Sequence, residues 1–213
     1  MENLEKTLKN LEEHFGGLQK NVPRYTVSKH DPRSSSEIKK GGMTGGDRMT
    51  QHGYARHYAK HLSTFVANQT NSYTILECGI LKGTGLAIWS ALFPNATIIG
   101  LDIDLSHTKN NLDFLKSKGA FKNKKLELYE FDQFVDNKSY IQEILQGRKL
   151  DIVIDDGFHS DYTILNTIEC LMPHLSDNFC YFIEDNKTVY TLLSEYTCYK
   201  SFNYDLLSVV TSQ

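Results

Sequence analysis

The chain has 213 residues and a mass of 24.3 kDa, which is the size of one domain with additional elements rather than of two full domains. Its composition, 40% hydrophobic and 23% charged, is that of a soluble globular protein with material for a core, and it excludes global disorder and a fibrous architecture. A formal net charge of −3 gives no bulk electrostatic reason to bind nucleic acid.

The sequence also bears on cellular compartment. Residues 1–11 alternate charged residues with Leu and lack the apolar core of a signal peptide, and no later run reaches the roughly 18 to 20 apolar residues that cross a bilayer. We therefore expect a cytoplasmic protein with neither membrane nor nucleic-acid partners. No CxxC pair occurs, so four buried free thiols are expected at Cys78, Cys170, Cys180 and Cys198.

The first 70 residues form an amino-terminal helical extension in this interpretation. Apolar residues at spacings of three and four predict an amphipathic helix over residues 1–18, which packs either on the main body or on another copy in a homo-oligomer. Residues 21–47 are rich in Pro, Ser and Gly, which predicts a long loop that is either a linker or a lid. A second helix is expected over residues 51–67.

From residue 71 onward, short β-rich segments alternate with helical ones, which predicts an α/β fold with a Rossmann-like, doubly wound, mostly parallel sheet. The tail is expected to add one short helix and two final strands, at 199–202 and 206–211. The five preceding strands are predicted at 73–78, 97–101, 126–131, 150–154 and 179–183, with helices at 85–92, 108–118, 139–146 and 162–172.

In such a sheet, ligands bind at the carboxyl ends of the strands. The first strand is followed by a glycine-rich turn that includes Gly79 and Gly83, and glycine permits a tight turn and a close approach of the backbone to a ligand. The turn matches neither a complete GxGxxG nor a GxxxxGK[ST] pattern, so an ordinary tight strand-to-helix connection is the alternative.

Acidic side chains end the next two strands. Asp102 follows the glycine turn by about 20 residues, where a carboxylate can accept hydrogen bonds from ribose hydroxyls, and the pair predicts an adenosine-type ligand. After the third strand, Asp132 and Gln133 can approach the adenine amino group, although a helix-capping or loop role is the alternative.

The fourth and fifth strands carry the strongest signal. Asp155 and Asp156 end the fourth, and Glu184 and Asp185 end the fifth. Four carboxylates at neighbouring strand ends repel one another unless they share a proton or a cation, and Mg²⁺ prefers such oxygen ligands. His159, three residues beyond Asp156, is a candidate general base, with an ordinary surface or capping histidine as the alternative.

Taken in order, these segments resemble the metal-dependent class I S-adenosylmethionine methyltransferases that act on sugar hydroxyls of macrolide antibiotics, together with the related cephalosporin hydroxylase-type proteins. The IDDG-x-H and IED elements carry most of the resemblance. The matching segments are residues 44–58, 76–79 with Gly83, 100–104, 132–133, 154–159 and 183–185.

The resemblance implies S-adenosylmethionine and Mg²⁺ as cofactors. It implies Asp156, Glu184 and Asp185 as Mg²⁺ ligands, with His159 as the catalytic base and Asp156 as the second catalytic residue. The implied cofactor-binding residues are Glu77, Gly79, Gly83, Asp102, Asp132, Gln133 and Asp155, the last as a support beside the cofactor.

The resemblance predicts O-methylation of a sugar or another small polyhydroxylated metabolite. Phe158 stands where the family usually has Ser, which alters the expected acceptor pocket. The helix of residues 51–67 brings His52, Tyr54, His57 and Tyr58 either toward the cofactor or into the core. A nicotinamide-dependent oxidoreductase and a non-catalytic cofactor-binding module are the alternative functions.

Overall fold

The structure, a computed structural model, describes residues 2–16, 46–196 and 199–212. A seven-stranded sheet with the order β3-β2-β1-β4-β5-β7-β6 forms its centre. Strands β1 to β5 are parallel, whereas β7 runs antiparallel to both of its neighbours. The strands are β1 (Thr74–Cys78), β2 (Thr97–Asp102), β3 (Leu126–Glu130), β4 (Leu150–Asp155), β5 (Leu175–Ile183), β6 (Lys200–Tyr204) and β7 (Leu207–Thr211).

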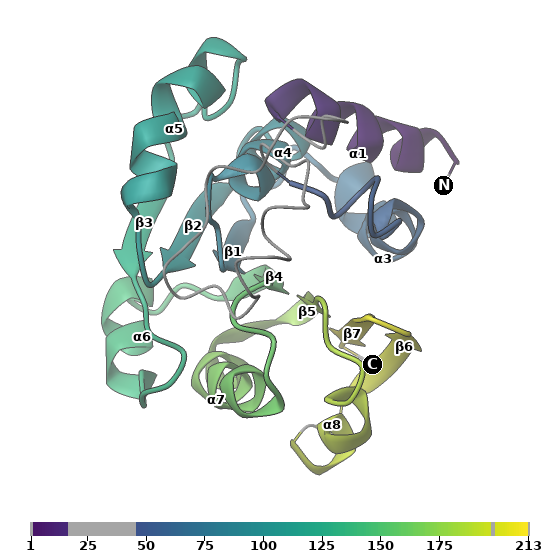
Figure 1. The fold of residues 1–213 in the computed structure, drawn as a ribbon, viewed down its shortest axis with the longest axis vertical. Helices are drawn as coiled ribbons and strands as arrows, with labels where there is room; N and C mark the ends of the chain where they lie inside the picture. The colour runs from purple at the N-terminus through teal and green to yellow at the C-terminus, as the bar shows by residue number, and fades with distance from the viewer. Residues whose placement is uncertain (1, 17–45, 197–198, 213) are drawn as a thin grey trace, which may run out of the picture.

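Helices cover both faces of the sheet (Figure 1). On one face lie α3 (Ala55–Ala67), α4 (Thr84–Leu92) and α5 (Ser106–Ser117), with α1 (Glu2–Phe15) packed on α3 and α4. On the other lie α6 (Lys138–Leu145), α7 (Asp161–Leu171) and α8 (Tyr190–Tyr196), and a 3-10 turn, η1 (Met172–His174), links α7 to β5. The predicted doubly wound α/β fold is thereby confirmed.

Alternation along the central strands explains why two helical layers are needed. Ile152 and Ile154 on β4 pack into the core beneath α3 and α4, whereas Val153 between them packs toward α6 and α7. Successive side chains of a strand point to opposite faces, so a strand that is apolar at every position must be buried on both sides.

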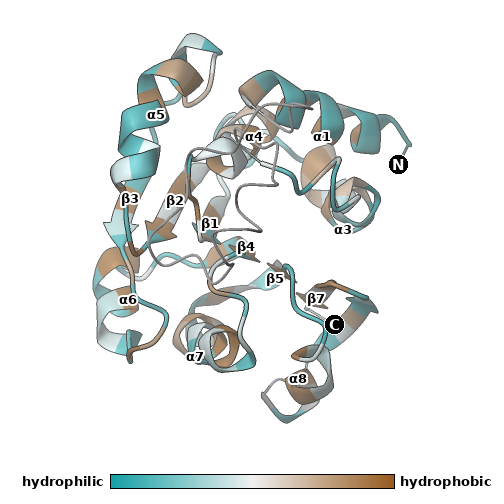
Figure 2. Ribbon diagram, in the orientation of Figure 1, coloured by the Kyte–Doolittle hydropathy of each residue, from teal (hydrophilic) through white to brown (hydrophobic). Residues whose placement is uncertain are grey.

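The amphipathic stripe of α1 is used inside the molecule. Leu8 and Phe15 are buried in the same core as α3 and α4, and Leu4 and Leu11 pack against it. Figure 2 shows the rest of this helix as largely hydrophilic. Of the two alternatives, the structure therefore shows the stripe folded back on the body, and α1 shares one core with the sheet.

Several element boundaries differ from the predicted ones. The helix expected from residue 51 begins at Ala55, because the amides of Gln51 and His52 both donate to the carbonyl of Asp47 in a preceding turn. The helix expected from residue 108 begins at Ser106, whose amide donates to the Asp104 carboxylate at 3.0 Å. Strand β5 is longer than predicted.

Other predictions concern residues only partly described. Of the loop predicted over residues 21–47, only Gly46 and Asp47 are described. Cys78, Cys170 and Cys180 are buried free thiols, as predicted, and Cys198 lies outside the described residues. Within the described ranges, no helix combines the length and apolarity needed to span a bilayer.

Candidate active site

The order in which strands are added to the sheet reverses between β1 and β4, which are neighbours and parallel. A cavity of about 540 Å³ opens at the carboxyl ends of these two strands. Backbone hydrogen bonds continue past the strand ends: the Gly79 amide donates to Leu101, Asp156 to Cys78, and Glu184 to Asp155. The glycine turn and the acidic strand ends therefore lie side by side, as the sequence predicts.

Close packing explains the first glycine of the turn. Gly79 has φ +82°, and a Cβ there would lie 2.0 Å from the carbonyl oxygen of Asp156. The turn ends at Gly83, which has φ +75° and caps the start of α4. Both glycines occupy left-handed conformations that L-residues rarely adopt, so the turn can pass close to β4 and leave the cavity open beside it.

Asp102 holds the glycine turn in place. Its Oδ2 accepts hydrogen bonds from the amides of Ile80 and Leu81, both at 2.9 Å, and its Oδ1 accepts one from the Asp104 amide at 3.0 Å. The residue lines the cavity, where the ribose contact predicted for it stays a prediction. The contacts of Asp102 with the neighbouring backbone were not predicted from the sequence.

Gln133 and Asp155 form a buried pair beneath the cavity. The Gln133 amide nitrogen donates to Asp155 Oδ1 and to Thr167 Oγ1, each at 2.9 Å, and its carbonyl oxygen accepts from the Phe158 amide at 2.8 Å. Burial raises the pKa of Asp155 to about 6, and the Gln133 hydrogen bond opposes that rise. These contacts fit the supporting role predicted for Asp155.

Asp132 has a local role as well as a place at the cavity wall. Its Oδ1 accepts the amide of Phe134 at 2.9 Å, which is the loop-stabilising role considered as the alternative. The predicted contacts of Asp132 and Gln133 with adenine stay predictions.

Arg48 was missed by the sequence analysis, although it lies at the centre of the acidic cluster. Its Nη2 donates to Glu77 Oε1 at 2.8 Å and to Asp156 Oδ2 at 2.9 Å, and its Nε lies 2.7 Å from Glu184 Oε1. Arg48 itself is only 5% exposed. One guanidinium thus binds carboxylates from three strands, β1, β4 and β5, at their carboxyl ends.

Two aromatic groups complete the hydrogen bonds of this cluster. Trp89 Nε1 donates to Glu77 Oε2 at 2.7 Å, and the Tyr58 hydroxyl donates to Glu184. Burial raises the pKa of Glu184, and the nearby Arg48 opposes that rise. Burial likewise raises the pKa of Asp156, again opposed by Arg48. Arg48 therefore offsets only part of the cost of burying these two carboxylates.

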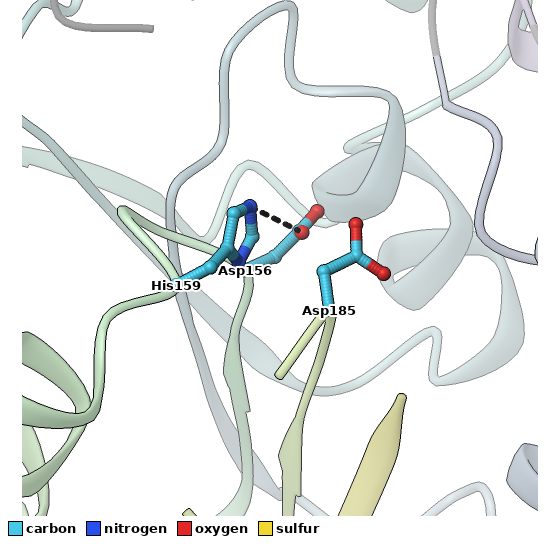
Figure 3. Close-up of side chains that lie close together, drawn as sticks. All are labelled: Asp156, His159 and Asp185. Carbon is cyan, nitrogen blue, oxygen red and sulfur yellow. Dashed lines mark ion pairs between the residues drawn. The ribbon is translucent and has the colours of Figure 1, made fainter. Parts of the chain in front are cut away.

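Asp156, His159 and Asp185 face one another at the cavity (Figure 3). One ligand atom from each lies within 4.8 Å of the other two, and His159 Nε2 is 3.9 Å from Asp156 Oδ1. The backbones of His159 and Asp185 are left-handed, with φ +66° and +56°, a conformation that persists only where the surroundings hold it. Asp156, Asp185 and His159 of the predicted grouping therefore lie together. Glu184, the other predicted ligand, is not part of this cluster and instead contacts Arg48 and Tyr58.

The segment before α3 closes the other side of Asp185. The Tyr54 hydroxyl donates to Asp185 Oδ1 at 2.6 Å, and His52 Nδ1 lies 3.4 Å from the same oxygen. A hydrogen bond with Asp47 raises the pKa of His52 to about 9. His57 instead stacks on Tyr204 with ring centroids 3.9 Å apart, so only part of the predicted aromatic set reaches the site.

Arg48 lies within the matching segment 44–58, but nothing in that segment marked this residue as part of the site. A single Arg after a glycine-rich segment is most often a surface residue, because Arg is almost never fully buried unless it is paired. The four carboxylates at the ends of the fourth and fifth strands nevertheless indicated that a cation is needed there. Part of that need is met by the chain itself.

No protein-family profile matches the chain. Its sequence is 28% identical over 147 residues to mycinamicin VI 2''-O-methyltransferase from Micromonospora griseorubida and 25% identical over 147 residues to L-olivosyl-oleandolide 3-O-methyltransferase from Streptomyces antibioticus. Each match covers 65% of this chain, and the chain spans about a third of the length of these relatives (33% and 34%).

Solved structures resemble the chain in fold. MycE methyltransferase from the mycinamycin biosynthetic pathway, in complex with Mg and SAH, aligns with a TM-score of 0.58 and 22% identity over 75% of this chain and 50% of that one. The O-methyltransferase TomG from Streptomyces achromogenes, in complex with SAM, aligns with a TM-score of 0.57 and 12% identity over 75% and 80%. The chain therefore shares the Rossmann-like fold of these methyltransferases. The resemblance to macrolide sugar O-methyltransferases expected from the sequence motifs is confirmed by the sequence relatives.

Proposed function

We propose that the protein is an S-adenosylmethionine- and Mg²⁺-dependent O-methyltransferase that acts on a hydroxyl of a sugar or another small polyhydroxylated metabolite. The observation that carries the proposal is the cluster of Asp156, His159 and Asp185 at the wall of the cavity, beside the glycine turn of β1. Residues 71–213 form the cofactor-binding domain in this proposal, the cytoplasm is its compartment, and the sequence relatives support the reaction class.

The donor set fits a divalent cation. Carboxylate oxygens of Asp156 and Asp185 are hard ligands, and Glu184, whose carboxylate contacts Arg48 and Tyr58, directly precedes Asp185. His159 Nδ1 is buried without a hydrogen-bond partner among the described residues, so this nitrogen is an unsatisfied polar group at the site. We propose Asp156, Glu184 and Asp185 as the ligands, and bound Mg²⁺ would lower the pKa of an acceptor hydroxyl.

The cavity also fits a cofactor with a positive centre. It is lined by Glu77, Asp102 and the glycine turn, so acidic groups and a closely approaching backbone face the same space. We assign Glu77, Gly79, Gly83, Asp102, Asp132 and Gln133 to the cofactor, with Asp155 as a support below it. Asp102 keeps the turn in shape through two backbone amides, which makes it a positioning residue as well.

His159 is assigned the role of general base. Its ring lies at the cavity wall beside Asp156, whose carboxylate stabilises the protonated imidazole once it has taken the acceptor proton. Phe158, on the same loop, packs edge-to-face against Phe134 at 4.8 Å and lines the cavity. These two rings give the acceptor pocket an apolar wall next to the base.

Calorimetry separates this proposal from its alternatives. We expect S-adenosylhomocysteine to bind the intact chain and NAD not to bind, and binding of NAD alone would favour an oxidoreductase. Transfer of a labelled methyl group to a panel of glycosides, followed by mass spectrometry with and without EDTA, tests catalysis. A chain that binds S-adenosylhomocysteine and Mg²⁺ yet methylates no polyol in the panel would favour a non-catalytic module.

A further inference from the structure

A buried carboxylate on α1 contacts the turn that carries Arg48. Glu12 is 0% exposed, and it accepts hydrogen bonds from the amides of Met49 (2.8 Å) and Thr50 (2.9 Å) and from the Thr50 hydroxyl (2.7 Å). Glu12 also lines the cavity. Because the turn and the helix are distant in sequence, this contact fixes where residues 47–50 sit on the body.

The position of Glu12 on its helix makes the carboxylate unusual. It lies four residues after Leu8 and three before Phe15, on the apolar face of α1, where a leucine would complete the core. Burying a carboxylate costs free energy unless its hydrogen bonds are satisfied. Here the oxygens are satisfied by the backbone and hydroxyl of the turn, so this carboxylate holds the turn rather than filling space.

What the turn delivers is the guanidinium of Arg48. Arg48 directly precedes Met49, so hydrogen bonds to the Met49 and Thr50 amides orient the backbone from which the Arg48 side chain extends. That side chain then reaches Glu77, Asp156 and Glu184. A chain of contacts therefore links α1 to the carboxyl ends of three strands.

We infer that Glu12 is a positioning residue for Arg48, and that α1 is part of the site rather than an accessory helix. Glu12 acts through the backbone of the turn and touches no reacting group. Its role for cofactor binding rests on the proposed function. The structural link to Arg48 does not.

The protein contains its own reporter of this link. Trp89 is the single tryptophan of the chain, its ring lies 5.6 Å from the Arg48 guanidinium carbon, and its indole donates to Glu77. Displacement of Arg48 removes a positive charge from beside the indole and also removes the ion pair of Glu77, the residue that accepts the indole hydrogen bond. Trp89 fluorescence therefore reports the Arg48 position in the protein without any ligand.

The test compares Glu12→Ala, Arg48→Met, the double variant, and Glu13→Ala as the matched control on the exposed side of the same helix. We expect Glu12→Ala and Arg48→Met to shift Trp89 emission in the same direction, the double variant to add nothing to Arg48→Met, and Glu13→Ala to match the wild type. Calorimetry should show about tenfold weaker S-adenosylhomocysteine binding for Glu12→Ala, in the range typical of supporting residues.

A merely structural role would lower the melting temperature of Glu12→Ala and leave Trp89 emission of the folded protein unchanged, and that result would overturn the inference. Should Glu12→Ala not fold, Glu12→Gln keeps an oxygen acceptor for one amide. It is expected to give a smaller shift of the same sign, and no shift in a folded Glu12→Gln would equally overturn the inference. Failure of wild-type protein to bind S-adenosylhomocysteine would count against the proposed function alone, because the emission comparison needs no ligand.

Discussion

Arg48 and Glu184 are 136 residues apart in sequence, yet Arg48 Nε lies 2.7 Å from Glu184 Oε1 and 2.9 Å from Glu184 Oε2 in the interior of the protein. Both residues are buried, at 5% and 2% exposure. The same guanidinium binds Glu77 and Asp156, so one cation organises the acidic strand ends. Because this cation is a side chain of the protein itself, a bound metal has to balance only the negative charge that Arg48 leaves uncompensated.

Replacing Arg48 with Met should strongly destabilise the protein. The substitution keeps much of the side-chain volume but leaves Glu77 and Glu184 buried without their counter-charge, which typically costs about 3–5 kcal/mol. Urea denaturation at neutral pH measures the loss, and Arg56→Met, at an exposed position on α3, is the matched control. A loss no larger than that of the control would show that the Arg48 contacts contribute little to folding.

Replacing Gly79 with Ala should damage both folding and the cofactor site. A Cβ there would lie 2.0 Å from the backbone oxygen of Asp156, which is closer than two non-bonded atoms can approach. Either the turn or the end of β4 would have to move to relieve this overlap. Gly147→Ala is the control, because Gly147 has nearly the same φ, +81°, with nothing within 4 Å of its added Cβ. The control should lose about 1 kcal/mol from backbone strain alone. Similar losses in the two variants would refute the close approach of the turn to β4.

His159→Ala should reduce turnover by roughly 10² to 10⁴, the usual cost of a lost general base, while Mn²⁺ affinity measured by electron paramagnetic resonance stays within a few-fold of the wild type. Both measurements are needed because the His159 imidazole lies close enough to Asp156 and Asp185 to bind the same cation. Turnover reports the role of a base, and Mn²⁺ affinity reports the role of a metal ligand. A loss of Mn²⁺ affinity as large as the loss of turnover would make His159 a metal ligand. Unchanged turnover would remove it from the mechanism.

The fold could be predicted from the sequence to a large extent, because its determinants are local. Strands with an apolar run such as residues 152–154, alternating with helices, require a parallel sheet buried on both faces, and the positions of the strand ends then follow from the topology. Arg48 and Glu12 could not be predicted, since each derives its role from partners on distant elements. A lone Arg carries no local signal of burial. Glu12 does fall on the apolar face of its helix, but nothing near it in sequence identifies its partners at Met49 and Thr50.

Stability should fall on acidification in a way that depends on His61. Burial lowers the pKa of His61 to about 4, and its Nε2 lies 2.9 Å from the Tyr204 hydroxyl. Between pH 6.5 and about 4, the unfolded chain binds a proton at this histidine and the native protein does not, so stability decreases as pH falls through this window.

His61→Gln removes that proton uptake while retaining a polar contact for Tyr204. The free energy of unfolding of this variant should therefore fall less steeply than that of the wild type between pH 6.5 and about 4, and the difference between the two proteins should be constant at pH values above this window. Parallel curves across the whole range would contradict the assignment of His61 as a half-buried neutral histidine.

The proposed function requires that carboxylates at the ends of β4 and β5 bind a divalent cation beside the cofactor. Titration of the full chain with Mg²⁺ by calorimetry, in the presence of S-adenosylhomocysteine, tests it most directly. We expect one Mg²⁺ to bind per chain in the wild type and in the exposed control Asp113→Asn. The double variant Asp156→Asn with Asp185→Asn should lose that binding and retain S-adenosylhomocysteine binding. Absence of Mg²⁺ binding by the wild type, or unchanged binding by the double variant, would contradict it.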